Sequence, residues 1–568
     1  MVEKTPLHTL PLLCWMAATP LVSGEPPQDS FDIVLAGGRI VDGTGSPWFR
    51  ADVGITGKRI AGIGDLSRAR ARRRVDAAGK IVSPGFIDMH SHASWGLLVD
   101  GRAASKITQG VTLEIEGEGE SVAPLSDAMV EASREEFSRF GVDPEWRSLE
   151  DFFERFARTP PAVNFATHIG TSNPRQMVVG HDDRPATPEE LEQMLSIVRA
   201  AMEEGALGVY SALMYSPDRF NRTEELVAMA RVASEYGGIY QSHVRSESNA
   251  VESALDEVFR IAREAGIPAH VTHFKVTYTQ NWGRMPSILE KIEEARAEGL
   301  DVTADLYPYT RAGGSFSPLL PPWVHDGGRE KMLDRLRDPA TRERIKNELA
   351  NPASTWENEY FGAGRGPEGF TLTDARGNAS LERYEGKTLA AIAAMEGKDS
   401  RDMVMDLVLA GDAGMTVLIT SEDDLRAAIL KPWVAFGSDG ETVAPDGPLS
   451  EGLPHPRAYG TYPRIFGEYV RELGLLRLED AVRKATSFPA QRLGIRDRGL
   501  VREGFYADLV VFDDAAIADR ATYEMPHQFA CGISHVLVNG KLVVDEGRVT
   551  DARPGMIVRG PGYRVRKP

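Results

Sequence analysis

The sequence predicts an α/β fold in which a parallel (β/α)₈ barrel is joined to a β-sandwich built from both ends of the chain. Three observations lead to this prediction. Eight short apolar segments alternate with longer stretches through the middle of the chain, most of which read as amphipathic helices. Both ends are rich in short β-type segments separated by turns. The length of 568 residues suits one large barrel with smaller additions.

The first 30 residues differ from the rest of the chain. They contain an apolar run of signal-peptide length, LPLLCWMAATPLVSG, but the segment before it is hardly basic and two prolines interrupt the run. Cleavage near Gly24 would make the protein periplasmic or secreted, and an uncleaved chain would be cytoplasmic. The sequence leaves both open. No later segment has the roughly 18 unbroken apolar residues of a membrane span.

Residues 31–82 and 497–568 are expected to form the β-sandwich domain. The first range reads as short strands separated by Gly-Gly, Asp-Gly and Thr-Gly turns. The same pattern of short β-type segments and turns occurs in EGFYADLVVFDD and ISHVLVNGKLVVDEGRV. Two β-rich ends around a different middle indicate one small sheet domain assembled from both termini.

The barrel is assigned to residues 83–496, where strands and helices alternate. Thr187 and Glu190 form a capping box at the start of one helix, and Gly205 ends it. Between about residues 313 and 424, a Gly-, Pro- and charge-rich stretch too long for a loop predicts an inserted subdomain. The strand candidates are GFIDMH, VTLEIEG, NFATHIG, LGVYSALMY, GIYQSHV, AHVTHFK, DVTADLYPY and VAFGSDG.

Charge and cysteine content narrow the classes of function. The formal net charge of −18 argues against nucleic acid as a partner. The chain has two cysteines, Cys14 and Cys531, so neither a disulfide framework nor a thiolate zinc cluster is available. Any metal ion must therefore be held by histidines and carboxylates.

Such side chains follow the predicted barrel strands at their C-terminal ends. Because side chains alternate along a strand, His90 and His92 point to the same side. In a barrel the C-terminal ends of all strands share one face, where the chemistry takes place. Imidazoles with carboxylates suit Zn²⁺ or a similar divalent ion. The candidate set is His90, His92, Glu118, His243, His273 and Asp439.

These residues and several longer motifs resemble a known family. The pattern FxDxHxH, single histidines on the fifth and sixth strands and an aspartate on the eighth resemble the amidohydrolase superfamily. The segments KITQGVT, YGGIYQSHVRSE, DVTADLYPYT, FGSDG and HPRAYGTYPR are similar to the N-acyl-D-amino-acid deacylases, or D-aminoacylases. The similarity runs from about residue 32 to residue 546. It implies a metal-dependent amidase that releases a carboxylic acid and an amino acid from an N-acyl-D-amino acid, with a closely related D-configured amide or dipeptide as a smaller variation.

The resemblance also implies roles for single residues. One tightly bound zinc ion would be held by Glu118, His243 and His273. A second ion would be held or approached by His90, His92 and Asp439, a strand-two glutamate could bridge the two, and other divalent ions remain open. Asp439 would carry a proton from water to the leaving amine. A small-molecule substrate with a free carboxylate is the expected partner, and the oligomeric state is left open. The residues expected to bind that carboxylate or shape its site are Arg245, Lys275, Tyr307 and Arg457. For Arg245 the alternative is an internal salt bridge, for instance with Glu247.

The chain departs from this family at two places. Where the family has a cysteine that ligates the tight zinc, this chain reads EGEGE. Glu118 is the expected replacement, and the neighbouring Glu116 and Glu120 stay open as alternatives. The end of the third strand, often Gly-His in the family, here reads HIGTSNPR with Thr171 in that place. The first change keeps a metal ligand but alters its hardness, and the second concerns the acyl or amino-acid pocket.

Two other functions are kept as alternatives. One is a cyclic-amide hydrolase of the hydantoinase or dihydroorotase kind, which usually bridges its metals with a carboxylated lysine. The fourth strand, GVYSALMY, offers no lysine, and this counts against it. The other is an inactive, metal-stabilised binding protein, which would have no need of a proton carrier at Asp439. No membrane partner is expected.

Overall fold

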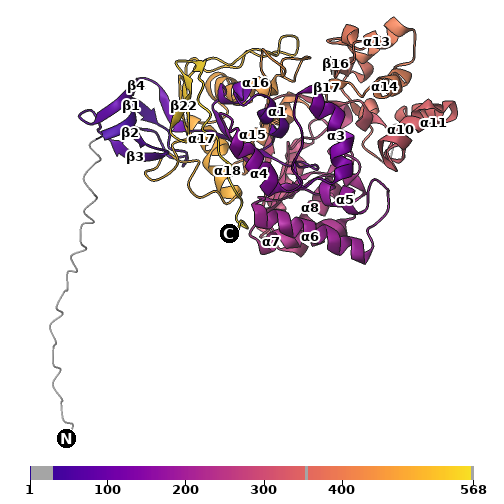
Figure 1. Ribbon diagram of the computed structural model, residues 1–568, viewed down its shortest axis with the longest axis horizontal. Coiled ribbons are helices and arrows are strands. Elements are labelled where there is room, and N and C mark those ends of the chain that lie inside the picture. Colours follow the sequence, from indigo (N-terminus) through magenta and orange to yellow (C-terminus); the bar gives the residue numbers. More distant parts are fainter. Residues whose placement is uncertain (2–29, 352–355, 565–568) are drawn as a thin grey trace.

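The computed structural model describes Met1 and residues 30–351 and 356–564. The leader predicted for the first 30 residues lies almost wholly outside this range. Within the described part, no helix is long and apolar enough to cross a membrane. Figure 1 shows β1–β4 and β22 at one end of the molecule, most of the barrel helices in the centre and α10–α14 at the opposite end.

One nine-stranded sheet joins the two ends of the chain. Its strand order is β23-β22-β21-β20-β5-β1-β2-β3, with β4 paired to β1. The junction between the two ends is the antiparallel pairing of β5 (Ile81–Pro84) with β20 (Leu509–Phe512). The strands are packed on a small apolar core drawn from both segments. The other strands are β1 (Ser30–Ile40), β2 (Phe49–Thr56), β3 (Arg59–Gly64), β4 (Arg70–Asp76), β21 (Ile533–Val538), β22 (Lys541–Asp545) and β23 (Arg548–Val549).

Parallel strands form the barrel that the sequence predicts. They pair in the orders β6-β8-β9 and β10-β11-β12-β13-β14-β18, and β10 follows β9 after one residue. The ring closes where Met89 N–H donates to Phe436 O (3.3 Å) and β7 (Ser91–His92) pairs with β19 (Gly440–Glu441). The strand bounds are β6 (Phe86–Asp88), β8 (Val111–Glu116), β9 (Asn164–Thr167), β10 (Ile169–Gly170), β11 (Gly208–Ala212), β12 (Ile239–His243), β13 (Ala269–Val271), β14 (Val302–Leu306) and β18 (Val434–Phe436).

Local sequence signals set the limits of the barrel helices. α6 (Pro188–Glu204) begins with the predicted capping box of Thr187 and Glu190, and Gly205 ends it with φ +111°. The other helices of this part are α1 (Ser94–Val99), α2 (Ala104–Ile107), α3 (Asp127–Arg139), α4 (Leu149–Arg158), α5 (Ser172–Val178), α7 (Thr223–Glu235), α8 (Val251–Ala265), α9 (Met285–Ala297), α15 (Glu422–Ile429), α16 (Arg457–Arg464), α17 (Leu478–Ala485) and α18 (Ser487–Arg492).

The segment between β14 and α15 has a hydrophobic core of its own, which extends from Phe316 to Ile419. It contains a three-stranded antiparallel sheet in the order β15-β17-β16. These contacts support the proposal of an inserted subdomain. Its elements are β15 (Arg311–Ser315), α10 (Gly328–Arg337), α11 (Pro339–Leu349), α12 (Glu359–Gly362), β16 (Phe370–Asp374), α13 (Leu389–Glu396), α14 (Ser400–Leu409) and β17 (Gly414–Leu418).

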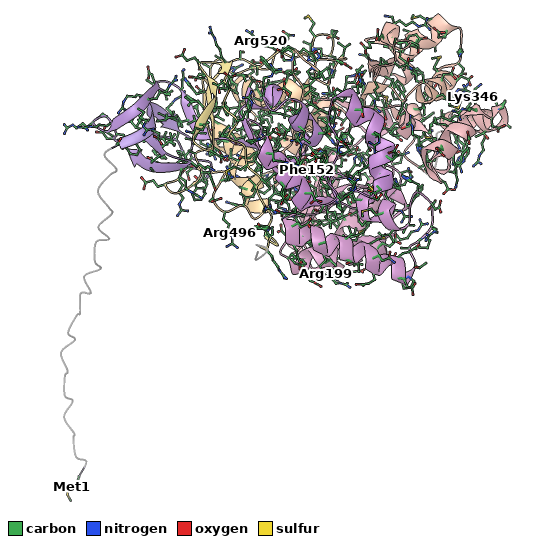
Figure 2. The ribbon with its side chains drawn as sticks, viewed as in Figure 1. Met1, Phe152, Arg199, Lys346, Arg496 and Arg520 are labelled. Carbon is green, nitrogen blue, oxygen red and sulfur yellow. The ribbon has the colours of Figure 1, made fainter. Side chains whose placement is uncertain are left out.

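The largest core lies between the barrel strands and the surrounding helices. Phe152 of α4 is fully buried there, and its ring packs edge-on against Phe165 of β9 with 5.7 Å between ring centres. Figure 2 shows Phe152 within the central body, whereas the charged Arg199 and Lys346 lie at its periphery. This packing fixes the strands of the barrel, and with them the positions of the side chains at their ends.

Candidate active site

The candidate ligand residues meet at the C-terminal ends of the barrel strands. His90 and His92, which the sequence places on one side of the first strand, lie with their ring centres 5.1 Å apart. The others come from four further strands, although they are distant in sequence. Glu118 follows β8, His243 ends β12, His273 follows β13, and Asp439 follows β18.

One group of three ligand atoms lies around Oε1 of Glu118. His243 Nδ1 is 2.8 Å from this oxygen, and His273 Nε2 is 3.4 Å from it. The two nitrogens are 2.9 Å from each other. All three side chains are almost completely buried. Two imidazole nitrogens and a carboxylate oxygen therefore converge on one point.

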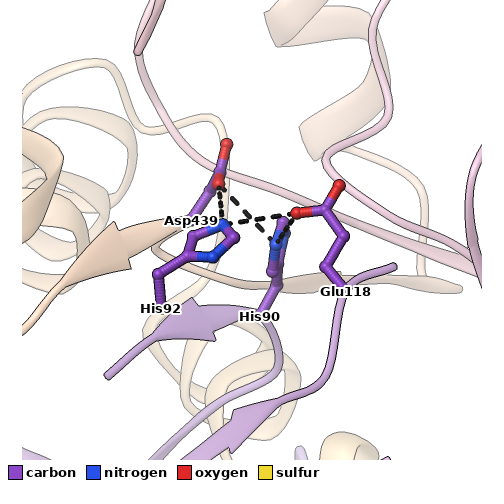
Figure 3. Close-up of side chains that lie close together, drawn as sticks. All are labelled: His90, His92, Glu118 and Asp439. Atoms are coloured by element: carbon purple, nitrogen blue, oxygen red, sulfur yellow. Dashed lines mark hydrogen bonds and ion pairs between the residues drawn. The ribbon is translucent and has the colours of Figure 1, made fainter. Parts of the chain in front are cut away.

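A second group lies around the other oxygen of the same carboxylate (Figure 3). Glu118 Oε2 is 2.9 Å from His90 Nε2 and 3.3 Å from His92 Nε2. Asp439 Oδ1 completes the group at 3.0 Å from His92 Nε2 and 3.6 Å from His90 Nε2. Glu118 thus offers one oxygen to each pair of histidines.

The two glycines beside Glu118 explain why this glutamate points into the barrel. Gly117 has φ +118° and Gly119 has φ +61°, backbone conformations that L-residues with side chains rarely adopt. A Cβ atom at Gly117 would lie 2.8 Å from His168 O, and one at Gly119 would lie 2.5 Å from the Cβ of Ala212. The chain therefore turns tightly on both sides of Glu118 and directs its carboxylate inward.

Neither neighbouring glutamate belongs to the two groups. Glu116 is buried beside Ser94, and burial raises the pKa of its carboxyl to about 7, against the charge of His92. Glu120 lies at the surface, where Gln176 Nε2 donates to its Oε2 at 3.1 Å. Of the three glutamates left open by the sequence, Glu118 alone is brought to the histidines.

The donor set fits a divalent metal ion. Around a tetrahedral zinc ion with bonds of about 2.0–2.1 Å, neighbouring ligand atoms lie roughly 3.3 Å apart. The separations from Glu118, between 2.8 and 3.4 Å, are close to this value. Burial and the neighbouring His273 lower the pKa of His243, which favours the neutral imidazole that a metal requires. Although burial acts to lower them, the surrounding carboxylates raise the pKa values of His92 and His273, so an ion bound at these rings would displace protons. The residues present can hold one ion at each pair of histidines, with Glu118 between them.

The two carboxyl groups are held in their charged forms. Burial alone would raise the pKa of Glu118, but His90 and the hydrogen bonds from His243 hold it well below its usual value. At Asp439 burial is likewise outweighed, chiefly by the charge of Arg457, and its pKa also lies far below the ordinary range. Both residues are therefore available as carboxylates at neutral pH.

Three of the predicted substrate-binding residues lie beside these groups. Arg457 Nη1 donates to Asp439 Oδ2 at 2.6 Å, and its guanidinium carbon is 4.8 Å from the ring centre of Tyr307. Lys275 Nζ is 5.6 Å from the same ring. The buried hydroxyl of Tyr307 has no hydrogen-bond partner among the described residues. A phenol with a free donor thus lies near two buried cations.

The prediction that Arg245 binds a substrate carboxylate is not supported. Its Nε and Nη2 donate to the two carboxylate oxygens of Glu257, both at 2.9 Å. The remaining donors go to the backbone carbonyls of Arg219 and Asn221. The alternative of an internal salt bridge describes this arginine, but with Glu257 of α8 as the partner. Glu257 lies about two turns into α8, and the helix places its carboxylate beside Arg245. The strand pattern alone does not indicate this contact.

Glu247 is a site residue that the sequence reasoning missed. Its Oε1 lies 3.0 Å from His273 Nδ1 and accepts a hydrogen bond from Lys275 Nζ at 2.8 Å. A carboxylate on the far nitrogen orients a ligand histidine and raises its basicity. Its position two residues beyond Arg245 in SHVRSE was the available signal.

Comparison with known proteins agrees with this arrangement. The sequence profile described as "Amidohydrolase family" matches residues 73–544, most of the chain. The chain belongs to the amidohydrolase family.

Among its relatives, this amidohydrolase is 37% identical to the D-aminoacylase of Alcaligenes xylosoxydans xylosoxydans over 529 residues, which cover 93% of this chain and 97% of the relative. The crystal structure of a D-aminoacylase matches 93% of this chain and all of its own, with a TM-score of 0.78 and 36% identity. The N-acyl-D-glutamate deacylase of Bordetella bronchiseptica, solved with zinc and a phosphonate inhibitor, matches 94% of this chain and all of its own, with a TM-score of 0.77 and 32% identity. These likenesses confirm the predicted fold class and the resemblance seen in the sequence.

A D-hydantoinase from Thermus sp. also covers 94% of this amidohydrolase and all of its own chain, but with 15% identity and a TM-score of 0.50. That likeness shows the fold alone. It gives no support to the cyclic-amide alternative beyond a shared architecture.

Proposed function

We propose that this amidohydrolase is a metal-dependent amidase that hydrolyses N-acyl-D-amino acids to a carboxylic acid and a free amino acid. The observation that carries the proposal is the Glu118 carboxylate, whose two oxygens each face a pair of histidines next to the buried Asp439. The names of two relatives, D-aminoacylase and N-acyl-D-glutamate deacylase, support this substrate class.

In this proposal Glu118, His243 and His273 would hold the tighter zinc ion. His90, His92 and Asp439, with the same glutamate, would hold or approach a second ion. A divalent ion bound there supplies a Lewis acid for the scissile carbonyl and makes water acidic enough to attack at neutral pH. The part of the protein is to fix the donors: Glu247 holds His273 through Nδ1 and leaves Nε2 directed at Glu118.

Asp439 is the proposed proton carrier. Its carboxylate faces His92 through Oδ1 and Arg457 through Oδ2, and its low pKa keeps it deprotonated at neutral pH. It takes a proton from the attacking water and delivers it to the nitrogen of the leaving amine. Without that second transfer the amine would leave as an anion, which is a far poorer leaving group.

Tyr307 and Lys275 are proposed to bind the free α-carboxylate of the substrate. The tyrosine hydroxyl has its donor available, and the Lys275 ammonium, which also donates to Glu247 Oε1 and His273 O, adds a positive charge. Arg457, paired with Asp439, adds a second positive charge near the Tyr307 ring. Charge-assisted hydrogen bonds of this kind select acids over the corresponding amides.

A substrate panel tests the proposal. Purified protein with added zinc is incubated with N-acetyl amino acids in both enantiomers, with the same compounds as amides in place of the free carboxylate, and with a hydantoin. Release of the amine is measured for each. Asp439→Asn serves as the control with a preserved fold. Turnover of the D-acids, lost in the control variant, is the expected result.

Other outcomes would each reject the proposal. Preference for the hydantoin would point to the cyclic-amide hydrolase, and exclusive turnover of L-acids would reject the stereochemical class. Zinc bound in full stoichiometry without any turnover would support the inactive binding protein.

A further inference from the structure

A buried lysine lies next to the turn that carries Asp439. Lys106, in α2, has no exposed surface. Its ammonium lies 3.1 Å from Asp88 Oδ2 and 3.2 Å from Glu114 Oε2. A buried ammonium is tolerated only when opposite charges and hydrogen bonds compensate it, and the two carboxylates meet that need. They do not account for the two other contacts that this lysine makes.

Those contacts lie on either side of Asp439 in the sequence. Lys106 Nζ donates to Ser438 Oγ at 2.9 Å and to Gly440 O at 2.8 Å. Asp88 Oδ1 accepts the backbone N–H of Ser438 at 2.6 Å, and its other oxygen accepts the Ser438 hydroxyl. Ser438 Oγ in turn accepts the N–H of Gly440 at 3.1 Å. Lysine and aspartate together hold both neighbours of the proposed proton carrier.

The backbone of Asp439 requires such support. Its φ is +51°, in the left-handed region that residues with a side chain seldom occupy. A conformation of this kind persists only where the surrounding contacts hold it. The N–H of Asp439 donates to His90 O at 2.8 Å, which fixes one end of the peptide. The contacts of Lys106 fix the residues before and after it.

We propose that Lys106 is a positioning residue, which holds the 438–440 turn so that the Asp439 carboxylate faces the metal ligands. This role rests on the proposed function, in which Asp439 carries the proton. The contacts of its ammonium go to Asp88, Glu114, Ser438 and Gly440, so Lys106 acts through the turn and not on the substrate. Although burial acts to lower it, the charges of Asp88 and Glu114 raise the pKa of Lys106, so its ammonium is retained.

The test compares Lys106→Met with a matched control, Lys484→Met. Lys484 is also buried, and its amine donates to the backbone carbonyls of Ile429 and Lys431. These two residues precede β18, whereas the turn at Asp439 follows it. Both substitutions replace a buried lysine by a side chain of similar size, and only the first loosens the turn at Asp439. Both variants are expected to melt at a lower temperature than the wild type.

Kinetics separate the two. In Lys106→Met, kcat for an N-acetyl-D-amino acid should fall about thirtyfold or more while KM stays within about threefold, because a transition-state contact is lost rather than ground-state binding. In Lys484→Met, kcat should stay within about twofold. Equal losses of kcat in the two variants, or an unchanged kcat in Lys106→Met, would overturn the proposal.

A double-mutant cycle shows whether Lys106 acts through Asp439. In an Asp439→Asn background, the added Lys106→Met change should lower kcat by no more than about threefold, because residues that act as a unit are not additive. A full second loss would assign Lys106 a general structural role. If Lys106→Met does not fold, Ser438→Ala, which removes the hydroxyl without leaving a buried charge unpaired, is put through the same cycle with the same expectation.

A crystal structure of Lys106→Met supplies a readout that does not depend on turnover. Asp439 should leave the left-handed region or its carboxylate should turn away from His92, and an unchanged turn would contradict the proposal. Wild-type rates in Asp439→Asn would reject the proposed function, whereas an inactive Asp439→Asn together with a fully active Lys106→Met would reject only the role of Lys106.

Discussion

Replacing Glu118 by alanine should remove a donor from both histidine pairs at once. Its Oε1 lies within 3.4 Å of His243 and His273, and its Oε2 within 3.3 Å of His90 and His92. Without Glu118, the group of His243 and His273 keeps only two imidazole donors, fewer than the three or four protein donors that zinc sites normally have. We therefore expect the variant to lose its tight ion.

The size of the effect can be bounded. Removing a partner that only supports a ligand costs 10- to 100-fold in metal affinity. Glu118 faces the ions directly, so the loss at the tighter group should be about 100-fold or more, equivalent to about 2.7 kcal/mol at 1.36 kcal/mol for each factor of ten. Turnover at limiting zinc should fall at least as far, because the second group loses an oxygen as well.

The assay is metal titration of chelated protein, followed by elemental analysis and turnover of an N-acetyl-D-amino acid. Since the wild-type donors are all nitrogen and oxygen, Mn²⁺ or Co²⁺ should restore activity about as well as Zn²⁺. Glu118→Cys should bind zinc again but accept a narrower range of ions, because a thiolate prefers softer metals.

Glu116→Ala and Glu120→Ala are the matched controls, one altering a buried glutamate and the other a surface one. Both should keep the metal affinity of the wild type to within about threefold, since neither carboxylate touches the histidine groups. A Glu118→Ala protein that retained its full metal complement at unchanged affinity would refute the assignment.

Three further predictions concern the same site. Asp439→Asn should keep its tightly bound metal ion but lose turnover by at least about a hundredfold, the usual scale for an acid–base group, and near-normal rates would show that another group carries the proton. Tyr307→Phe should raise KM about tenfold or more for substrates with a free carboxylate and leave the matching amides unaffected; equal changes for both would point to a packing role. Glu247 has a pKa of about 2 because Lys275 and His273 outweigh its burial, below the ordinary 4.5, so its stabilisation is complete above pH 4.5 and is lost as the pH falls toward 2. In metal-free protein, Glu247→Gln should therefore lower the free energy of unfolding by about 3 kcal/mol at pH 7, and urea titrations should show the difference from wild type closing between pH 4.5 and 2.

The barrel and most of its site residues follow from the sequence because the relevant signals are local. Capping residues mark helix ends, as at Thr187 and Gly205, and apolar segments mark the strands between them. Side chains at the C-terminal ends of parallel strands share one face whatever the loops do, so His90, His243 and Asp439 could be placed together without coordinates.

The tertiary structure alone decided which partners these side chains take. Among the three glutamates, Glu118 is directed toward the histidines by the positive φ angles of Gly117 and Gly119. The sequence does not indicate this, because strand periodicity does not fix side-chain direction beyond the end of a strand.

Arg245 pairs with Glu257 and not with a substrate site. Lys106 donates a hydrogen bond to Ser438, which lies 332 positions away in the sequence. Neither pairing leaves a local signal, since each arises from the packing of a helix against the strand ends. The partners of a buried charge depend on the segments that the fold brings around it. Only the tertiary structure shows which segments these are.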